Sequence, residues 1–565
     1  MTWRVGVDAG GTFTDVCFFN EETGELEVAK VSSTPSDPSR AVIAGVRDVL
    51  ASGAPDKVVT YFAHGSTVAT NALIQKRGVE TGLITTEGFR DLLELGRQKR
   101  PHLYDLQTDK PVPLVTRDRR IEVKERLLHD GTVVSEIDEE EVRAAVRKLR
   151  DQGVRSIAIC FLYSFVNGDH ERLVERIVQE EYPEAFVTSS YQVMPEFREY
   201  ERLSTVVVNA YLGPVMASYL DRLAPDLKDA GIPVHPHINQ SNGGVISFET
   251  AASMPVRTVL SGPSSGIVGA TYVSGLSGHG DLITFDMGGT STDVSLIRDG
   301  RPGLASEADV EGYPVKTPML DIRAVGAGGG SIAWIDSGGH LKVGPQSAGA
   351  VPGPVCYGLG NEEPTVTDAN VVLQTLNPTH LLGGRMPIDA AASAAAIDRL
   401  AERLGLDRMP TAQGIIRVVI ANMARAIRVI SVQRGYDPRD FTLVAFGGAG
   451  PLHASRLAKE LEIPRVLVPE VPGLLCALGL LVADLRTDYS MTRLLDANES
   501  AIADLEEVLG DLAVRADTWF GLEEIPEHRR MLRFAVDMRY RGQNYELPVD
   551  IPAGPVTASL IRELR

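Results

Sequence analysis

Apolar positions along this chain follow two alternating spacings, one typical of amphipathic helices and one typical of buried strands. A clear example begins at Asp138, a candidate helix N-cap with Glu141 three residues later. Apolar residues then recur at helical spacing up to Leu149, Gly153 ends the predicted helix, and residues 154–165 form an apolar run expected to be a buried strand. This alternation recurs along the chain and predicts an α/β architecture.

A second helix and strand are predicted later in the chain. Apolar spacing predicts a long helix over residues 415–433, ending near Gly435, and a strand over residues 441–446. The loop at residues 447–450, with the sequence GGAG, follows that strand directly. Because it opens another predicted helix, its glycines are placed where backbone can pass close to a ligand, although a tight helix start explains them equally well.

Two segments lack clear periodicity. Residues 91–131 are rich in Arg, Lys and Pro and are expected to be an excursion over a site, and residues 326–360 are expected to be loop-like. The longest apolar run, residues 471–485, is interrupted by Pro472, Gly473, Gly479 and Asp484, so no membrane span is predicted.

The composition changes near Ser490, where a helical pattern over residues 501–516 is followed by a strand pair around Tyr540 and Gly542. A chain of 565 residues is too long for one core. We therefore expect domains at residues 1–190 and 191–490, followed by a small, partial C-terminal α+β segment at residues 491–565.

Charge and cysteine usage narrow the class of protein. The net charge of −19 argues against nucleic acid and against an anionic membrane surface as partners, because both are bound by basic patches. The four cysteines are far apart and show no CxxC spacing, which favours reduced thiols over a zinc cluster. With no apolar signal region at the N-terminus, we expect a cytoplasmic protein.

The most informative motif occurs twice. GVDAGGTFTDV at residues 6–16 returns as TFDMGGTSTDV at residues 284–294, with seven identities 278 positions apart. Two copies so distant cannot be a short-period solenoid, so they predict two related half-sites around one bound molecule. In both copies β-branched residues follow the glycines, which predicts strand, glycine turn and strand rather than the strand, turn and helix of a dinucleotide site.

The residue types in the motif fit polyphosphate binding. Glycines let backbone amides approach phosphate closely, and threonine hydroxyls add donors. Carboxylates beside phosphate need a cation, so the four aspartates suggest Mg²⁺ held largely through water. For a single copy, an ordinary hairpin with capping aspartates would be favoured; two matching copies favour phosphate binding.

The order of motifs resembles a known ATPase superfamily. A segment rich in small residues, 261–275, precedes the second copy and is typical of a helix packed closely on another. Together with the GGAG loop, this order resembles the actin, sugar kinase and heat-shock chaperone ATPases. That resemblance implies two ribonuclease-H-like lobes with an interlobe cleft for Mg-ATP.

More specifically, the chain resembles the hydantoinase A / 5-oxoprolinase family, the ATP-binding subunit also related to the acetone carboxylase β subunit. The resemblance covers roughly residues 5–488 and rests on the two hairpin motifs and on further segments in order. These include AHGSTVATNALIQKRG (63–78), GFRDLLELGRQKRPHLYDL (88–106), PEFREYERLSTVVVNAYL (195–212), QSNGG (240–244), GAGGGSIAW (326–334), VGPQSAGAVPGPVCYG (343–358) and VAFGGAGPLHA (444–454).

The family implies that ATP phosphorylates the oxygen of a cyclic amide or imide, which makes its carbon open to attack by water, or that it activates a ketone for carboxylation. Either reaction depends on positioning and charge neutralisation. A hydantoinase B-type partner subunit is also implied, and hence a hetero-oligomer. The requirement for a monovalent cation is left open.

The resemblance also suggests roles for individual residues. The phosphates are assigned to the two turns, the adenosine to the GGAG loop, and the GAGGG segment is placed at or against ATP. Asp8 and Asp286 are the best candidates for catalytic or cation-binding carboxylates, followed by Asp15 and Asp293. The other candidates are Gly10, Gly11, Thr12, Thr14, Gly288, Gly289, Thr290, Gly328, Gly329, Gly330, Gly447, Gly448 and Ala449.

Candidates at the substrate end are His64, Thr67, Asn71, Arg97 and Tyr104. A hydrogen-bonded structural histidine is the favoured interpretation of His64, and a solvated loop explains Arg97 and Tyr104 equally well. Arg198 and Arg202, with Glu199 and Glu201, are expected to form ion pairs on a helix surface. Arg323 stands where relatives often carry another polar residue, which leaves the branch of the family open.

The leading hypothesis is thus a Mg-ATP-dependent hydrolase subunit that opens a hydantoin, 5-oxoproline or lactam. The closest alternative is a β-type subunit of a ketone carboxylase. A nucleotide-switched scaffold protein is a third hypothesis, disfavoured because no long exposed apolar stripe is evident in the sequence.

Overall fold

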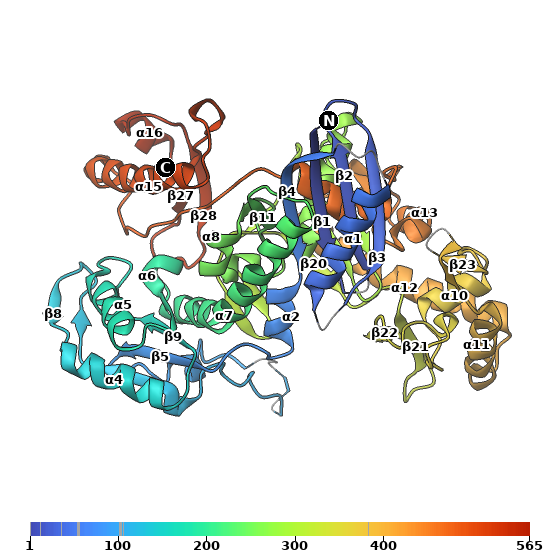
Figure 1. Ribbon diagram of the computed structural model, residues 1–565, viewed down its shortest axis with the longest axis horizontal. Helices are drawn as coiled ribbons and strands as arrows, with labels where there is room; N and C mark the ends of the chain where they lie inside the picture. Colours follow the sequence, from blue (N-terminus) through green and yellow to red (C-terminus); the bar gives the residue numbers. More distant parts are fainter. Residues whose placement is uncertain are drawn as a thin grey trace. The chain divides into compact units, whose positions relative to one another are not determined.

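The computed structural model describes residues 2–11, 13–34, 37–52, 57–100, 104–105, 107–381 and 384–564 (Figure 1). The chain divides into two compact units. The first comprises Met1–Arg77, Val215–Ala308 and Pro318–Arg486, and the second comprises Gly78–Pro214, Asp309–Thr317 and Thr487–Arg565. The domain boundaries near residues 190 and 490 expected from the sequence stay a prediction.

The first unit contains a six-stranded sheet that forms its first lobe. Its strand order is β12-β11-β4-β1-β2-β3. Neighbours β1, β2 and β3 run antiparallel, whereas β4 pairs with β1, and β11 with β4, in parallel. The strands are β1 (Thr2–Ala9), β2 (Phe13–Asn20), β3 (Leu26–Ser32), β4 (Val58–Ser66), β11 (Pro236–Asn239) and β12 (Val245–Ser247).

A second sheet in the same unit repeats this topology. Its order β20-β14-β13-β25-β26 matches β3-β2-β1-β4-β11, with the same antiparallel and parallel pairings. The strands are β13 (Leu282–Met287), β14 (Thr292–Arg298), β15 (Arg301–Pro302), β20 (Ile322–Val325), β25 (Thr442–Phe446) and β26 (Arg465–Leu467). The sequence-based expectation of two ribonuclease-H-like lobes is therefore confirmed.

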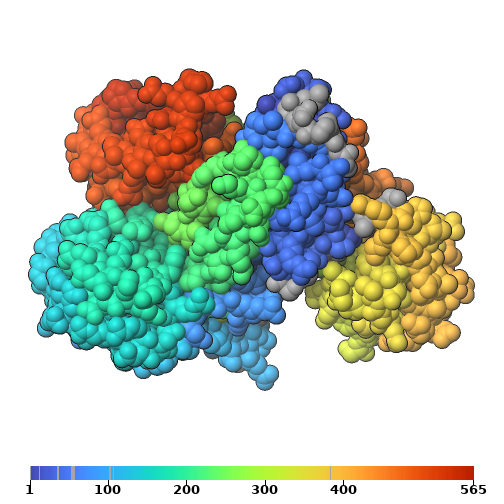
Figure 2. All heavy atoms as spheres, viewed as in Figure 1, coloured from blue at the N-terminus to red at the C-terminus, as the bar shows by residue number. Residues whose placement is uncertain are grey.

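Helices cover both sheets. Helix α1 (Pro38–Ser52) lies across β2 and β3 in Figure 1, and Figure 2 shows the same face of the first lobe filled by side chains. On the second sheet, the main core is built around α12 (Arg408–Ile430), with eleven buried positions along that helix. The other helices of this unit are α2 (Val68–Ile74), α8 (Phe248–Ser253), α10 (Val366–Val372), α11 (Ala390–Leu404) and α13 (Gly450–Glu460).

Two further helices join the lobes. Ile267 and Ala270 of α9 (Gly262–Leu276) pack against the second sheet, whereas Ala477 and Leu481 of α14 (Leu475–Val482) pack against the first. Gly479 allows them to cross closely, because a Cβ there would overlap the carbonyl oxygen of Ser265. The close helix packing predicted from the small residues 261–275 is confirmed.

The second unit is built on a parallel four-stranded sheet, β10-β9-β5-β6. Its strands are β5 (Thr81–Thr86), β6 (Arg120–Val123), β9 (Ser156–Cys160) and β10 (Phe186–Ser189), with helices α3 (Leu92–Leu95), α4 (Glu139–Asp151), α5 (Asp169–Glu181) and α6 (Ser190–Val193). The C-terminal segment adds α15 (Ile502–Leu522), the antiparallel pair β27 (Phe534–Met538) and β28 (Leu547–Ile551), and α16 (Ala558–Glu563). The helix and strand pair expected there are confirmed.

Helix α7 (Glu199–Asp229) runs through the boundary of the two units at Pro214. Within the described residues it is the one helix long and apolar enough to cross a membrane, but 78% of its most apolar window is buried inside the protein. Core helices of soluble proteins have the same character. The expected surface ion pairs at its start are wrong for Arg202, which is buried and donates hydrogen bonds to Ser164, Ser190 and the carbonyl of Phe161.

Local predictions fail mainly in the irregular segments. Asp138 caps α4 by accepting from the amides of Glu140 and Glu141, as predicted, but α12 begins at Arg408 rather than at residue 415. The segment 91–131 is not all loop, since it supplies β6 and β7 (Arg126–Leu127). Likewise, residues 326–360 contain the hairpin β21 (Ser331–Ile335) and β22 (Leu341–Ser347). These strands are too short, and too mixed in polarity, to show a period in the sequence.

Small two-stranded pairs complete the fold. They are β7 with β8 (Val133–Ser135), β16 (Leu304–Ala305) with β19 (Met319–Leu320), β17 (Ala308–Val310) with β18 (Tyr313–Val315), and β23 (His380–Leu381) with β24 (Met386–Pro387).

The crossing of α9 and α14 predicts a sharp difference between two glycines. Gly479→Ala should lower the free energy of unfolding by about 1–3 kcal/mol, because its methyl group overlaps the backbone of α9. Gly275→Ala, in α9 but with open space around its Cβ position, should be neutral or stabilising by about 0.5–1 kcal/mol. Urea denaturation of the two variants measures the difference, and equal stabilities would contradict the close crossing.

Candidate functional site

The first hairpin turn joins β1 to β2 and carries the first motif copy. Asp8 and Asp15 stand opposite each other in the register, and the amide of Gly10 donates to the carbonyl of Phe13 at 3.0 Å. Gly11 is exposed, with open space where a Cβ would stand. Thr12, assigned to phosphate from the sequence, lies outside the described residues. The turn therefore presents backbone rather than side chains at Gly11.

The second turn, between β13 and β14, has the same geometry. Asp286 stands opposite Asp293, and the amide of Gly288 donates to the carbonyl of Ser291 at 3.0 Å. Gly289 and Thr290 are exposed, and within the described part of the chain their amides donate no hydrogen bond. Free, exposed amides beside glycine are what a phosphate group would need at this turn.

The matched threonines support the turns from below. Thr14 is buried, and its hydroxyl lies 3.0 Å from that of Ser33, which in turn donates to the carbonyl of Gly10 at 2.7 Å. Thr292 is also buried and donates to the carbonyl of Ala327. The structure thus places the side chain of Thr14 beneath the turn, where it fixes the conformation of the backbone.

The charges of the hairpin aspartates act on one another across the two turns. This indicates that the two turns lie close together within the first unit. Burial, followed by the charges of Asp15 and Asp286, raises the pKa of Asp8 to about 7. Burial, followed by the charge of Asp293, raises the pKa of Asp286 to about 7. Burial also raises the pKa of Asp293 to about 7. These carboxylates are close enough to repel and lack enough positive charge to stabilise their ionised forms.

Lys30 is the cation of this cluster. Its Nζ lies 2.5 Å from Oδ1 of Asp15 and 3.4 Å from the carbonyl of Gly473, and it stands 5.2 Å from the centre of the Phe13 ring. Burial raises the pKa of Asp15, while the ammonium of Lys30 opposes this shift. Sequence reasoning missed Lys30, because it comes from β3, outside both motif copies.

Two glycines make room for the central carboxylates. A Cβ at Gly65, on β4, would stand 2.5 Å from Oδ1 of Asp8, and a Cβ at Gly447, after β25, would overlap Oδ1 of Asp286. Because β4 and β25 are equivalent strands in the two sheets, each lobe supplies a glycine beside its own aspartate. Gly447 also has a φ of +79°, which an L-residue adopts only with strain.

The GAGGG segment packs against the second turn. The amide of Gly329 donates to the carbonyl of Gly288 at 3.0 Å, and that of Gly330 donates to the carbonyl of Gly289 at 2.6 Å. A Cβ at Gly328 would stand 2.6 Å from the carbonyl carbon of Thr290. The segment therefore holds the turn in place, and its expected position at or against ATP stays a prediction.

The GGAG loop begins α13 beside the same turn. The amide of Ala449 donates to the carbonyl of Met287 at 2.9 Å, and that of Gly447 donates to the carbonyl of Pro472 at 2.9 Å. Gly448 is exposed, with open space around its Cβ position. The loop thus offers an open backbone surface next to Asp286, and its assignment to adenosine stays a prediction.

Cys476, at the start of α14, contacts the cluster. Its Sγ donates to Oδ2 of Asp286 at 3.7 Å, and burial together with the charges of Asp286, Asp8 and Asp15 raises its pKa well above the ordinary value. The side chain of Cys476 is therefore a neutral thiol that donates a hydrogen bond to Asp286. Sequence reasoning missed this thiol, because Cys476 lies within an apolar run far from either motif.

The donor set of the cluster fits Mg²⁺. All four candidate ligands are carboxylates, which hard cations prefer. Within the described residues, no three of these carboxylates have their oxygens within 4.8 Å of one another, so a dedicated all-protein cage is absent. Asp8, Asp286 and Asp293 would instead hold the ion through few direct contacts and bound water. The cation would neutralise charge between phosphate and carboxylate.

The histidine expected at the substrate end is buried. His64, on β4, has Nε2 2.7 Å from the Tyr219 hydroxyl and Nδ1 3.2 Å from the carbonyl of Val7, and burial lowers its pKa to about 4. Both ring nitrogens thus have partners in the protein. Thr67 lies near the first turn, with its hydroxyl 3.5 Å from the carbonyl of Ala9, and Asn71 donates to Thr67 at 3.1 Å. A role for any of the three in substrate binding stays a prediction.

Arg97 and Tyr104 belong to the second unit. The guanidinium of Arg97 donates to both carboxylate oxygens of Glu201, at 2.7 and 2.5 Å. Tyr104 is 96% exposed, as expected for a solvated loop. A role for Arg97 or Tyr104 in substrate binding stays a prediction.

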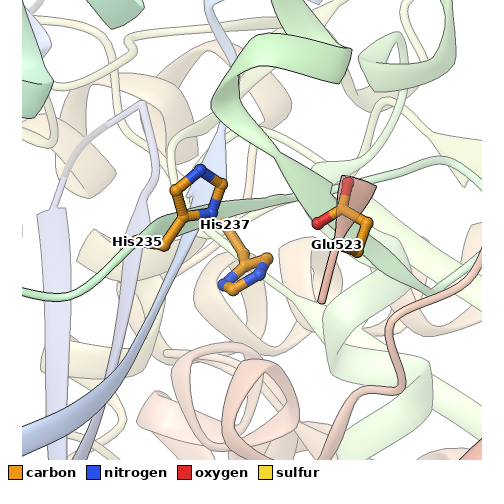
Figure 3. Close-up of side chains that lie close together, drawn as sticks. All are labelled: His235, His237 and Glu523. Carbon is orange, nitrogen blue, oxygen red and sulfur yellow. The ribbon is translucent and has the colours of Figure 1, made fainter. Parts of the chain in front are cut away.

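Two histidines lie side by side at β11, outside the carboxylate cluster (Figure 3). The His237 ring stacks on Tyr61 with ring centres 5.5 Å apart, and the His235 ring meets that of His237 edge-on at 5.7 Å. Nε2 of His235 lies 3.1 Å from a carboxylate oxygen of Glu249. Glu523, also drawn in Figure 3, is the C-cap residue that follows α15 in the second unit. His237 is therefore packed against β4 through Tyr61, whereas His235 is exposed immediately before β11.

The raised pKa values of Asp8, Asp286 and Asp293 predict a pH-dependent effect of Mg²⁺. Each folded-state pKa is about 7, well above the ordinary value of an aspartate. These three groups therefore lower the free energy of unfolding as the pH rises from about 4 to 7, and this destabilisation is complete above about pH 7. Mg²⁺ favours the ionised form, so it should raise the melting temperature clearly at about pH 8 and little at about pH 5.5. Calorimetry at both pH values checks this, with Asp293→Asn as a variant expected to show a smaller effect.

Alanine substitutions at Gly447 and Gly448 test whether the GGAG loop binds the nucleotide. Gly447→Ala should weaken ATP binding at least about tenfold, because its methyl group overlaps the Asp286 carboxylate and its φ is unfavourable. Gly448→Ala should change the affinity by less than about threefold, since its Cβ meets open space. Isothermal titration with Mg-ATP measures both, and equal affinities would argue against a nucleotide at this loop.

Comparison with known proteins gives a consistent result. Residues 4–182 match the family model for the hydantoinase/oxoprolinase N-terminal region, and residues 202–489 match the hydantoinase/oxoprolinase model. Over 579 aligned residues the chain is 39% identical to caprolactamase subunit alpha of Pseudomonas jessenii, covering 100% of this chain and 82% of that protein.

Two solved structures share the fold. The crystal structure of ATP-dependent caprolactamase from Pseudomonas jessenii has a TM-score of 0.87 at 37% identity, covering 99% of this chain and 83% of that one. The nucleotide-free structure of acetone carboxylase, from work on ATP-dependent acetone carboxylation, has a TM-score of 0.82 at 30% identity, covering 100% and 83%. The chain therefore belongs to the hydantoinase/oxoprolinase family.

Proposed function

We propose that this chain is the ATP-binding subunit of an enzyme that opens a cyclic amide or imide. The observation that carries the proposal is the pair of glycine turns with buried aspartates of raised pKa, in a chain 39% identical to a caprolactamase subunit. The substrate class comprises lactams, hydantoins and 5-oxoproline, whose ring C–N bond is unreactive because of amide resonance.

In this proposal the amide oxygen attacks the γ-phosphorus of ATP and ADP leaves, which gives an imidate phosphate. Water then attacks the activated carbon, and the ring C–N bond breaks as the nitrogen takes up a proton, which leaves an acyl phosphate. A second water hydrolyses this acyl phosphate to the carboxylate and inorganic phosphate. The backbone amides of the two turns would hold the phosphates, and Asp8 and Asp286 would face the transferred group. Positioning and charge neutralisation supply the rate increase, as in other phosphoryl transfers.

A divalent cation held beside Asp8, Asp286 and Asp293 would supply charge neutralisation at the β- and γ-phosphates when bound. The residues of the chain contribute the geometry. Gly65 and Gly447 leave room for the carboxylates of Asp8 and Asp286. Cys476 orients Asp286, and Gly328–Gly330 fix the second turn.

A second subunit belongs to the proposal. The caprolactamase relative is a subunit alpha, and the relative from Xanthobacter autotrophicus, 30% identical, is an acetone carboxylase beta subunit. We therefore infer a hetero-oligomer with a hydantoinase B-type partner, in the cytoplasm.

Carboxylation of a ketone is the alternative, supported by the similarity to the acetone carboxylase structure. It uses the same phosphate turns, but the phosphorylated oxygen belongs to a ketone enolate. The presence of bicarbonate distinguishes the reactions: ATP consumption that requires both a ketone and bicarbonate supports carboxylation, whereas ring opening needs only water.

The proposal predicts phosphate release that depends on a cyclic amide. A panel of lactams, hydantoins and 5-oxoproline, assayed with Mg-ATP and with the product of the neighbouring gene, should contain a substrate that raises the rate well above the basal ATPase. Asp8→Asn should reduce this rate at least about a hundredfold, because it removes a carboxylate that would hold the divalent cation beside the transferred phosphate. Glu249→Gln, on α8 outside the cluster, is the control and should stay near wild type. Failure of the wild-type chain to bind Mg-ATP, with or without its partner, would refute the proposal.

A further inference from the structure

The two halves of the duplicated site differ in the residue that stands opposite the second aspartate of each hairpin. Opposite Asp15, in the register of β2 with β3, stands Lys30. Opposite Asp293, in the register of β14 with β20, stands Ala324. Because β3 and β20 are equivalent strands, a lysine in one half of the site corresponds to an alanine in the other.

Lys30 is held firmly in the first half. Its ammonium lies 2.5 Å from the Asp15 carboxylate, its Nζ is 3.4 Å from the Gly473 carbonyl, and its side chain runs beside the Phe13 ring. The side chain is 24% exposed and that of Asp15 is 13% exposed, so the pair is only weakly screened by water. The charge of Asp15 is thus already compensated within the protein.

In the described part of the chain, the second half has no ion pair of this kind, and the charge of Lys30 lowers the pKa of Asp286 less than burial and the charge of Asp293 raise it. Among the described residues, neither Asp286 nor Asp293 forms an ion pair with a lysine or arginine. Asp286 accepts from the neutral thiol of Cys476, and Ser291 is the group that favours the ionised form of Asp293. Two adjacent carboxylates without a cation are a favourable place for a divalent ion, whereas the ammonium of Lys30 repels one.

We propose that Lys30 makes the two half-sites chemically unequal: it serves as the fixed cation of the first half and directs the divalent cation to Asp286 and Asp293 in the second. This inference rests on the proposed function and deepens it, because it gives the duplicated site a direction. Lys30 is a positioning residue, which acts by deciding where the metal binds. The phosphate chain then meets an ammonium at one turn and a metal at the other.

Mn²⁺ alone, titrated into the purified full chain and followed by electron paramagnetic resonance, tests the location of the metal. Asp293→Asn should weaken Mn²⁺ binding at least about tenfold, because it removes an uncompensated ligand. Asp15→Asn is the matched variant on the other hairpin and should change the affinity by less than about threefold, since Lys30 already neutralises that carboxylate.

Lys30→Met tests the role of the lysine directly. Removal of the ammonium frees Asp15 beside Asp8, so the number of Mn²⁺ ions bound per chain should rise from one to two. Lys30→Arg should keep one. Lys57→Met is the control, because Nζ of Lys57 lies 2.5 Å from the Glu27 carboxylate on the same strand β3 but away from the turn, and its loss should leave one ion bound. Circular dichroism checks that each variant is folded.

The outcomes separate this inference from the proposed function. Equal weakening of Mn²⁺ binding by Asp15→Asn and Asp293→Asn overturns the inference, and so does a Lys30→Met chain that is folded yet binds a single ion. If Lys30→Met does not fold, the comparison of the two asparagine variants still decides. A wild-type chain that binds neither Mn²⁺ nor ATP overturns both proposals. If the wild-type chain binds both ligands but Asp293→Asn weakens Mn²⁺ binding no more than Asp15→Asn does, this inference alone is overturned.

Discussion

The close crossing of α9 and α14 is the contact on which the rest of the first unit depends. Each helix packs on the sheet of a different lobe, and the two backbones touch where Gly479 meets Ser265. A side chain at Gly479 would push the helices apart, and the two sheets with them. Since the two glycine turns lie at the ends of β1 and β13, we expect the separation of the helices to set the distance between Asp8 and Asp286.

That distance carries an electrostatic cost. Burial raises the pKa values of Asp8, Asp286 and Asp293 to about 7, and the neighbouring charges of Asp15 and Asp293 add to the shifts of Asp8 and Asp286 respectively. Tight packing of the core around α12 and of the two crossing helices offsets this cost. Sites that must receive a charged ligand commonly keep such unfavourable groups, since the ligand supplies the missing charge.

Gene duplication explains the shared topology of the two lobes, but function depends on where the copies differ. The registers Asp8–Asp15 and Asp286–Asp293 are the same, and so are the hydrogen bonds that close the two turns. Lys30, Cys476 and the segment Gly328–Gly330 each occur on one side only. A symmetric clamp would hold a phosphate chain in either direction, whereas in our proposal these differences give the site a polarity.

The sequence by itself determined the α/β class, the two hairpins and their aspartates, and the small-residue helix, because each of these depends on local spacing or on a repeated motif. It also placed Asp138 correctly as a helix cap. It did not reveal Lys30, Gly65 or Cys476 as neighbours of the aspartates, nor that Thr14 is buried. Those facts were decided only by the tertiary structure, since sheet pairing and helix crossing bring together residues that are hundreds of positions apart and carry no shared pattern in the chain.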